Sequence, residues 1–182
     1  SALIPYLARI PIRTGELGES RYILINDLRK FTKDDRRKTA FRYVSMFTKK
    51  EEVLDEKYYP SLKSDPEKIK ILSSKYKIDL KKKIIIFAPG AAFGPSKMWP
   101  VEKFKELGEK LNKDFFILVL GSKSEKNIGD KIVTNKNVIN LCGKTSITDA
   151  VDLMHISEFC VSNDSGLMHL AAATNTKSIS IY

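Results

Sequence analysis

Short apolar runs, each followed at once by a glycine-containing turn and then by a helical pattern, recur along the second half of the chain. Two of them, Ile84–Ala88 and Phe115–Leu120, are apolar at every position, which is typical of strands buried on both faces of a parallel sheet. From Lys83 onward this strand, turn and helix unit repeats about three times, and right-handed crossovers make such a series a parallel sheet with helices on both faces. The sequence therefore predicts an α/β, Rossmann-like fold.

The last unit contains the stretch Phe159–Ala173, where a strand meets an Asn-Asp-Ser-Gly turn and passes into a helix. A helix N-terminus presents unpaired N–H groups and a positive dipole end, so this turn can hold a phosphate. An Asn or Asp that caps an ordinary helix explains the motif equally well when it is taken alone. Ligands of open α/β sheets bind at the edge where such turns gather. We expect one crevice there to collect Lys97, Glu125, Thr145 and residues 164–169.

The first part of the chain is interrupted by glycines and carries several arginines. Arginines in a glycine-containing loop can hold phosphate or carboxylate groups bidentately, although a solvated surface explains them as well. A loop is predicted over Glu16–Arg29. Helices are predicted over roughly Arg36–Phe47, from Pro66 with Ser64 or Asp65 as the cap, and over Asp149–Ser157 with Ser146 or Thr148 as the cap. We place the domain boundary between Tyr59 and Leu80, which gives domains of residues 1–80 and 81–182.

Composition restricts the function classes. The 182 residues carry a formal net charge of +10, which reflects either a lysine-rich solvated surface or anionic partners. The two cysteines, Cys142 and Cys160, have neither CxxC nor Cys/His ligand spacing, so we expect buried thiols rather than disulfides or zinc. No apolar run approaches the ~18 residues of a membrane span, and no signal peptide is visible, so we expect an intracellular protein.

Four ordered motifs in the second half resemble those of a known family. They are Phe93–Pro100, Leu120–Ser122 with Glu125, Cys142–Thr145 and Asn163–Ala173. Together they resemble the ADP-heptose:lipopolysaccharide heptosyltransferases, glycosyltransferase family 9, and above all its heptosyltransferase II members. Residues 10–29 are similar to the later part of the same family's acceptor domain, so the resemblance covers effectively the whole chain.

The resemblance implies a GT-B fold, in which two Rossmann-like domains face each other across a cleft. Residues 81–182 would form the donor domain and residues 1–80 the later part of the acceptor domain. The implied activity transfers heptose from ADP-L-glycero-D-manno-heptose to the lipopolysaccharide inner core, the second heptose onto the first, at the cytoplasmic face of the inner membrane. Peripheral contact with the anionic membrane face and no nucleic-acid partner are expected. No Asp-x-Asp or His/Cys cluster is present, so we expect a metal-independent reaction without a cofactor.

The same resemblance assigns roles to individual residues. Lys97 would stabilise the diphosphate charge and Asp164 would orient the donor sugar, which makes these two the catalytic candidates. Glu125 would bind the ribose hydroxyls and Thr145 would line the adenine pocket. The complete donor-binding set is Gly94, Ser96, Lys97, Glu125, Thr145, Asp164, Ser165, Gly166 and His169. The candidates for acceptor contact are Arg13, Arg21, Arg29 and Arg37.

Two departures from the family pattern carry expectations of their own. The glycine-rich loop whose aspartate would act as general base has no counterpart here, so we expect that base to lie outside this chain. The chain also stops at Tyr182, where the family continues. We therefore expect a fragment, truncated at both ends, that binds the donor but is a poor catalyst. Two other hypotheses remain open: a GT-B transferase with another nucleotide sugar, and a basic nucleic-acid-binding protein, which would need recognition aromatics or a basic stripe that the sequence lacks.

Overall fold

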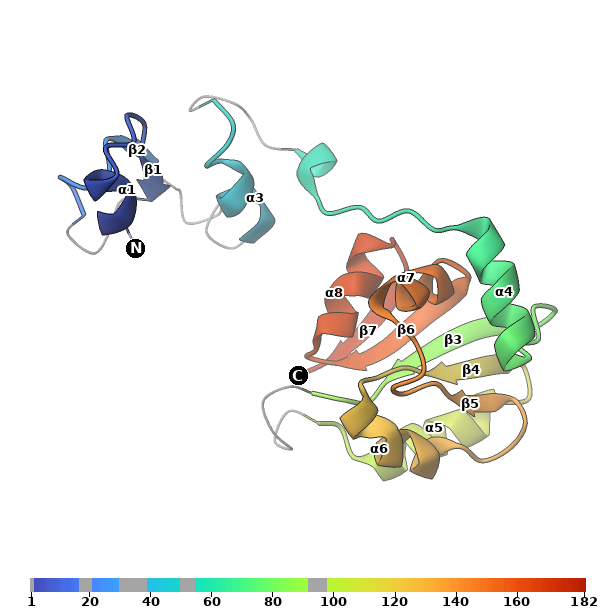
Figure 1. Ribbon diagram of the computed structural model, residues 1–182. Helices are drawn as coiled ribbons and strands as arrows, with labels where there is room; N and C mark the ends of the chain where they lie inside the picture. Colours follow the sequence, from blue (N-terminus) through green and yellow to red (C-terminus); the bar gives the residue numbers. More distant parts are fainter. Residues whose placement is uncertain (1, 17–20, 30–38, 50–54, 92–97) are drawn as a thin grey trace. The chain divides into compact units, whose positions relative to one another are not determined.

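The chain divides into two compact units, residues 1–60 and 61–182 (Figure 1). In the computed structural model the described residues are 2–16, 21–29, 39–49, 55–91 and 98–182. The division falls within the boundary region Tyr59–Leu80 expected from the sequence, near its start, and residues 61–80 group with the second unit.

A five-stranded parallel sheet forms the centre of the second unit, with its strands in the order β5-β4-β3-β6-β7. The strands are β3 (Lys83–Ala88), β4 (Phe115–Val119), β5 (Val138–Asn140), β6 (Ser157–Asn163) and β7 (Lys177–Ile181). The chain moves outward on one side of β3 and then crosses to the other side, which is the order of a Rossmann-like sheet. The predicted α/β class with a parallel sheet is therefore confirmed.

Helices cover both faces of this sheet (Figure 1). Ile84 and Ile86 of β3 face a cluster that includes Leu72, Leu153 and Ala171. These three residues come from α4 (Pro66–Tyr76), α7 (Ile147–His155) and α8 (Gly166–Ala173). The alternate side chains of β3 face the other cluster, formed with α5 (Val101–Leu111) and α6 (Lys126–Ile132). Burial on both faces is what the uninterrupted apolar runs predict.

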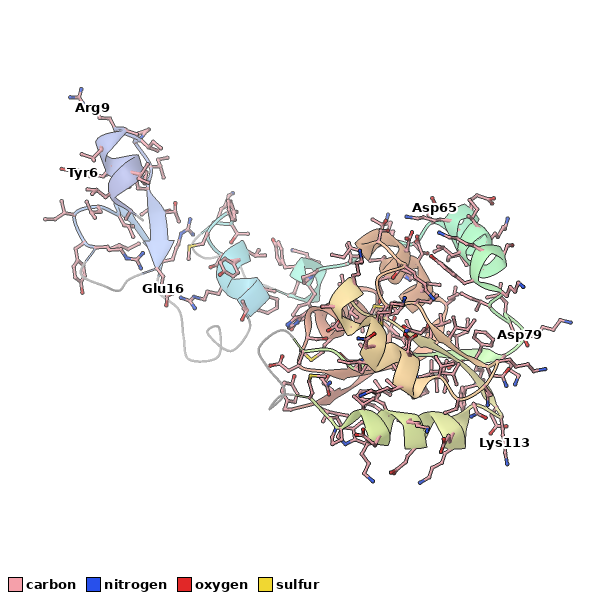
Figure 2. The ribbon with its side chains drawn as sticks, turned by 60° about the horizontal axis from the view of Figure 1, so that its bottom comes forward. Tyr6, Arg9, Glu16, Asp65, Asp79 and Lys113 are labelled. Atoms are coloured by element: carbon pink, nitrogen blue, oxygen red, sulfur yellow. The ribbon has the colours of Figure 1, made fainter. Side chains whose placement is uncertain are left out.

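Local signals fix where two of these helices begin. Asp65 caps α4 by accepting hydrogen bonds from the N–H groups of Glu67 at 3.0 Å and Lys68 at 3.3 Å (Figure 2). Pro66 follows it, as the sequence predicts. Ser146 caps α7, so that helix begins at Ile147, two residues before the predicted start.

Helix α4 is attached to the second unit by apolar and polar contacts. Leu72 is buried, and the Asp65 N–H donates to Asp152 Oδ1 at 2.8 Å. The Lys68 ammonium group lies 2.9 Å from Asp149 Oδ1. These contacts explain why the unit includes residues that the sequence assigned to the first domain.

The first unit has smaller elements. They are α1 (Leu3–Leu7), β1 (Thr14–Glu16), β2 (Asp27–Arg29), α3 (Thr39–Val44) and the short 3-10 helix η1 (Glu56–Tyr58). β1 and β2 pair in parallel, and Thr14 Oγ1 donates to Asp27 Oδ2 at 2.8 Å. The sequence predicted a loop at β2, which was wrong because a charged strand of three residues has no apolar pattern. The described part of the helix predicted at Arg36–Phe47 ends at Val44.

The sequence contains no apolar run long enough to predict a membrane-spanning helix. Among the residues whose positions are described, no helix combines the length and the apolar character that crossing a bilayer requires.

Candidate functional site

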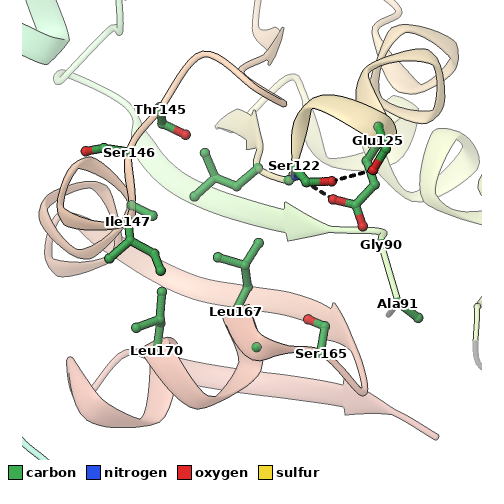
Figure 3. A pocket seen from close by; sticks show the side chains of 15 residues that line it. Gly90, Ala91, Ser122, Glu125, Thr145, Ser146, Ile147, Ser165, Leu167 and Leu170 are labelled. Carbon is green, nitrogen blue, oxygen red and sulfur yellow. Dashed lines mark hydrogen bonds between the residues drawn. The ribbon is translucent and has the colours of Figure 1, made fainter. Parts of the chain in front are cut away.

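A cavity of about 620 Å³ lies at the carboxyl edge of the parallel sheet, where the turns after β3, β4, β5 and β6 meet (Figure 3). One part of its lining is apolar and consists of Leu120, Ile147, Ala150, Leu167 and Leu170. Another part is polar and consists of Ser122, Ser124, Glu125, Thr145, Ser146 and Ser165. Such a cavity suits a ligand with a flat apolar ring at one end and hydroxyl groups or negative charge at the other.

Glu125 is held at this edge by the local structure after β4. It ends the 3-10 helix η3 (Lys123–Glu125), and its Oε2 accepts a hydrogen bond of 2.5 Å from the Ser122 N–H (Figure 3). A carboxylate can only accept hydrogen bonds, so Glu125 is suited to bind ligand hydroxyl groups.

The turn after β5 brings Thr145 to the cavity. Gly143 in this turn has φ +71°, a left-handed conformation that favours glycine. The Tyr76 hydroxyl donates to the Lys144 carbonyl at 2.6 Å, and the Lys144 ammonium group donates to the Asn140 carbonyl at 2.8 Å. The turn is therefore tied both to α4 and to the end of β5.

Ser146, which follows Thr145 in the chain, forms a capping box with Asp149. The Ser146 N–H donates to Asp149 Oδ2 at 2.8 Å, and the Asp149 N–H donates to Ser146 Oγ at 3.1 Å. Burial by itself would raise the pKa of Asp149, but hydrogen bonds from Ser146 and Lys68 outweigh it and lower that pKa below its ordinary value. The Lys68 pKa is raised, mainly by its hydrogen bond to Asp149.

Ser165 and Gly166 stand at the N-terminus of α8, which spans eight residues. Ser165 makes no side-chain capping bond, and its hydroxyl instead lies 3.1 Å from Ser162 Oγ. Apart from Gly166 itself, its chain neighbours and the backbone of its own helix, no described atom lies within 4 Å of the place where a Gly166 Cβ would be. Helix α8 begins at Gly166, which lines the cavity and has open space beside it. The first backbone N–H groups of the helix can therefore bind an anion there.

The structure brings together four of the predicted donor-binding residues. Glu125, Thr145, Ser165 and Gly166 all line the cavity. Asp164 precedes this lining by one residue and His169 is exposed on α8, and neither belongs to the set of described residues that line it. The other predicted residues, Gly94, Ser96 and Lys97, lie outside the described residues.

Asn163 is a positioning residue that sequence reasoning missed. Its side chain is fully buried, its Nδ2 donates to the Pro89 carbonyl at 2.7 Å, and its Oδ1 accepts from the Trp99 N–H at 3.0 Å. One amide group therefore joins the two ends of the segment that carries Lys97. Asn163 is a polar residue at the buried end of strand β6, and this position is the sequence signal that could have identified it.

The two cysteines are buried and free, as predicted. The pKa of Cys142 is raised to about 12, mainly by burial and to a smaller extent by the nearby Glu125 and Asp130 carboxylates. Burial raises the pKa of Cys160 to about 12 as well. Both thiols are therefore neutral near pH 7 and serve as apolar packing groups.

The arginines predicted to contact an acceptor belong to the first unit. Arg13 Nε donates to the Leu24 carbonyl at 2.8 Å, and the Arg29 guanidinium group lies 3.0 Å from Asp27 Oδ2. The first contact ties Arg13 to the segment just before β2, and the second lies within β2. Arg21 is partly buried in this loop, and Arg37 lies outside the described residues.

The second unit is thus a Rossmann-like α/β domain with a ligand-sized cavity at the carboxyl edge of its sheet. Comparison with known proteins makes this class specific: the sequence model of glycosyltransferase family 9 (heptosyltransferase) matches residues 1–182. The chain belongs to that family.

Several relatives span the whole chain. Lipooligosaccharide heptosyltransferase 2 of Haemophilus influenzae is 36% identical over 197 residues, covering 100% of this chain and 57% of the relative. The protein of the same name from Haemophilus ducreyi is 39% identical over 190 residues, covering 96% of this chain and 54% of the relative. The chain therefore spans about half the length of the curated relatives it matches.

A solved structure supports the fold class. The ADP-heptose lipopolysaccharide heptosyltransferase II of Escherichia coli superimposes with a TM-score of 0.73 at 31% sequence identity, covering 98% of this chain and 58% of that one. The structural neighbours are GT-B heptosyltransferases, so the GT-B class predicted from the sequence is confirmed.

Proposed function

We propose that this chain binds the nucleotide sugar of a heptosyltransferase that moves heptose from ADP-heptose to the inner core of lipopolysaccharide. The observation that carries the proposal is the convergence of Glu125, Thr145, Ser165 and Gly166 on one cavity. The names of the relatives support the sugar and the acceptor class. The second heptose added to the first is the proposed product, and the cytoplasmic face of the inner membrane is the proposed place of reaction.

The residues of the cavity suit the parts of ADP. The apolar part, formed with Ile147, Leu167 and Leu170, would contact the adenine ring, with Thr145 beside it. The Glu125 carboxylate would accept hydrogen bonds from the ribose hydroxyls. The N-terminus of α8 would then receive the diphosphate.

Heptose transfer breaks the bond between the sugar C1 and the diphosphate oxygen, and the bonding electrons leave with ADP. The acceptor hydroxyl oxygen forms the new bond to C1 and gives its proton to a general base, which we expect to lie outside this chain. Negative charge grows on the departing diphosphate, so N–H groups of α8 and the Lys97 ammonium group would stabilise the transition state. Asp164 would orient the sugar hydroxyls during this step. We propose that these groups suffice without a metal ion. Measuring heptose transfer in the presence of a chelator would test this proposal.

Calorimetric titration with ADP, UDP and GDP tests the donor assignment. We expect ADP to bind more tightly than UDP or GDP. We also expect Glu125→Ala and Lys97→Ala each to weaken ADP binding by about tenfold or more, because each variant loses a charge-assisted contact. Lys103→Ala, on the exposed side of α5, is the control and should leave ADP affinity unchanged. Equal affinity for ADP and UDP would favour a GT-B transferase with another nucleotide sugar.

A further inference from the structure

The Glu125 carboxylate occupies the space that the side chains of two glycines would fill. A Cβ built on Gly90 would lie 1.5 Å from Glu125 Oε1, and a Cβ on Gly121 would lie 2.7 Å from Glu125 Oε2. Gly90 comes two residues after β3 and Gly121 two residues after β4, so the carboxylate lies across the ends of two adjacent strands.

Backbone conformation does not explain either glycine. Among the described glycines Gly143 has a positive φ, whereas the φ angles of Gly90 and Gly121 are outside the left-handed region. An alanine could therefore adopt either backbone conformation without strain. What an alanine could not do is share its space with the Glu125 carboxylate.

A hydrogen bond fixes the carboxylate from a third direction. The Ser122 N–H donates to Oε2, and in Figure 3 the carboxylate lies between Ser122 and Gly90. The side chain is thus confined by one donor and two bare backbone surfaces. Confinement lowers the conformational entropy that a bound ligand would otherwise have to remove.

We propose that Gly90 and Gly121 are positioning residues that hold Glu125 in the orientation needed to bind the two vicinal hydroxyls of the donor ribose. This inference rests on the proposed function, because it takes the ribose as the ligand of Glu125. Each carboxylate oxygen accepts a hydrogen bond from one hydroxyl, and the fixed orientation matches the two acceptors to the two donors. A methyl group at either glycine displaces the carboxylate and removes that match.

The test measures the affinity of the chain for ADP and for 2′,3′-dideoxy-ADP, which lacks both hydroxyls, by calorimetry. The variants are Gly90→Ala, Glu125→Ala and the double variant. We expect Gly90→Ala to weaken ADP binding about tenfold and to change dideoxy-ADP binding less than twofold. In the Glu125→Ala background the space beside residue 90 is vacated, so the added methyl group should weaken ADP binding no further.

Gly108→Ala is the matched control, because its added Cβ would meet Phe87 at 3.5 Å, an ordinary contact remote from the cavity. If Gly90→Ala does not fold, Gly121→Ala is the second variant. Its Cβ would lie 2.7 Å from Glu125 Oε2 and 3.0 Å from Cys142 Sγ, so only the part of its effect that disappears in the Glu125→Ala background supports the inference. Equal weakening of both nucleotides, or additive effects in the double variant, would show a purely structural role and overturn the inference. Wild-type protein that binds ADP no better than UDP would overturn the proposed function instead, so the two failures are distinguishable.

Discussion

The two compact units of the chain differ most in how much apolar surface they bury. In the second unit the central strand residues Ile86, Phe87 and Leu118 are 0% exposed, and helices cover both faces of the sheet. In the described part of the first unit, Ile25 and Phe41 are the buried apolar residues, while Ile4 and Ile23 are more than 70% exposed. The described contacts of the first unit are largely polar, and include those of Arg13, Asn26 and Arg42.

This difference bears on where a precise site can be built. Close-packed interiors resist deformation, so turns anchored on the strands of the second unit keep their side chains in place. The first unit, as described, relies more on individual hydrogen bonds and ion pairs. Paired substitutions, one in each unit, test this contrast.

The largest effect is expected from the aromatic core. Phe104 is fully buried and contacts Phe87 and Trp99 edge to face, at ring distances of 5.5 Å and 5.0 Å. Phe104→Ala should lower the free energy of unfolding of the second unit by about 3–5 kcal/mol. Phe41→Ala, which removes a ring stacked on Tyr59, should cost about 2 kcal/mol and only in the first unit.

Trp99 is the single tryptophan, so its fluorescence during urea unfolding reports on the second unit, and far-UV circular dichroism reports on both units. Phe41→Ala should leave the fluorescence midpoint unchanged. If Phe41→Ala shifted the fluorescence midpoint as much as Phe104→Ala does, the two units would unfold together. That result would contradict the difference in stability between the two units.

Two asparagines form the same bridge in different surroundings. Asn163 is buried and joins Pro89 to Trp99, whereas Asn26 is exposed, accepts from the Arg13 N–H at 2.8 Å and donates to the Pro11 carbonyl at 2.7 Å. Asn163→Ala leaves two backbone groups without partners in the interior and should cost about 2–4 kcal/mol.

Asn26→Ala leaves groups that water can reach and should cost about 1 kcal/mol or less. Hydrogen exchange followed by mass spectrometry resolves the two regions in one experiment. Similar losses of protection in both variants would contradict the contrast in burial.

The capping box of α7 makes the second unit sensitive to acid. The pKa of Asp149 is lower in the folded state than in the unfolded chain, so its contribution is present above its unfolded pKa of about 3.9 and is lost as the pH falls through the folded value. Asp149→Asn should cost about 1 kcal/mol at pH 7, and its stability should approach that of the wild type at low pH.

The measurement is the urea midpoint of Trp99 fluorescence between about pH 6 and pH 2. Asp114→Asn, which changes an exposed carboxyl group between α5 and β4, is the control. A constant difference between Asp149→Asn and wild type over this range would contradict the assignment. The raised pKa of Lys68 has the opposite sign: its contribution is present below its unfolded pKa and is lost as the pH rises through the folded value.

The smallest effects are expected from ion pairs near the surface. Arg42 pairs with Glu16 and links α3 to β1 in the first unit, whereas Lys103 and Glu106 form an exposed pair of 2.9 Å within α5. Arg42→Gln should cost about 0.5–1 kcal/mol and Lys103→Gln about 0–0.5 kcal/mol. Hydrogen exchange of β1 and of α5 measures the two losses. A larger loss in α5 than in β1 would argue against the first unit's dependence on polar contacts.

The sequence predicted the sheet well because strands buried on both faces leave an unambiguous apolar pattern. β3 and β4 begin and end within one residue of their predicted limits. β2 was missed because Asp27 and Arg29 are charged, and their pairing depends on contacts with β1 and the preceding loop that periodicity does not encode. The start of α4 was recognisable from Asp65 and Pro66, whereas for α7 both Ser146 and Thr148 were candidate caps and the predicted start was two residues late.

The candidate site was predictable where its residues follow strands directly. Glu125, Thr145 and Ser165 fall on such turns, and topology alone brings these turns to one edge. The apolar lining was not predicted, because periodicity does not distinguish a helix face that packs on the sheet from one that borders a cavity. The roles of Lys97 and of the four arginines remain predictions.

The packing of α4 determines where the molecule can be dissected. The Leu62 N–H donates to the Ala173 carbonyl at 2.8 Å, Leu72 and Ile78 belong to the core, and Tyr76 supports the turn at Lys144. An excised second unit should therefore start at Ser61. One that starts at Lys81 would lose part of its own interior and the support of the turn at Lys144, and we expect it to aggregate on expression.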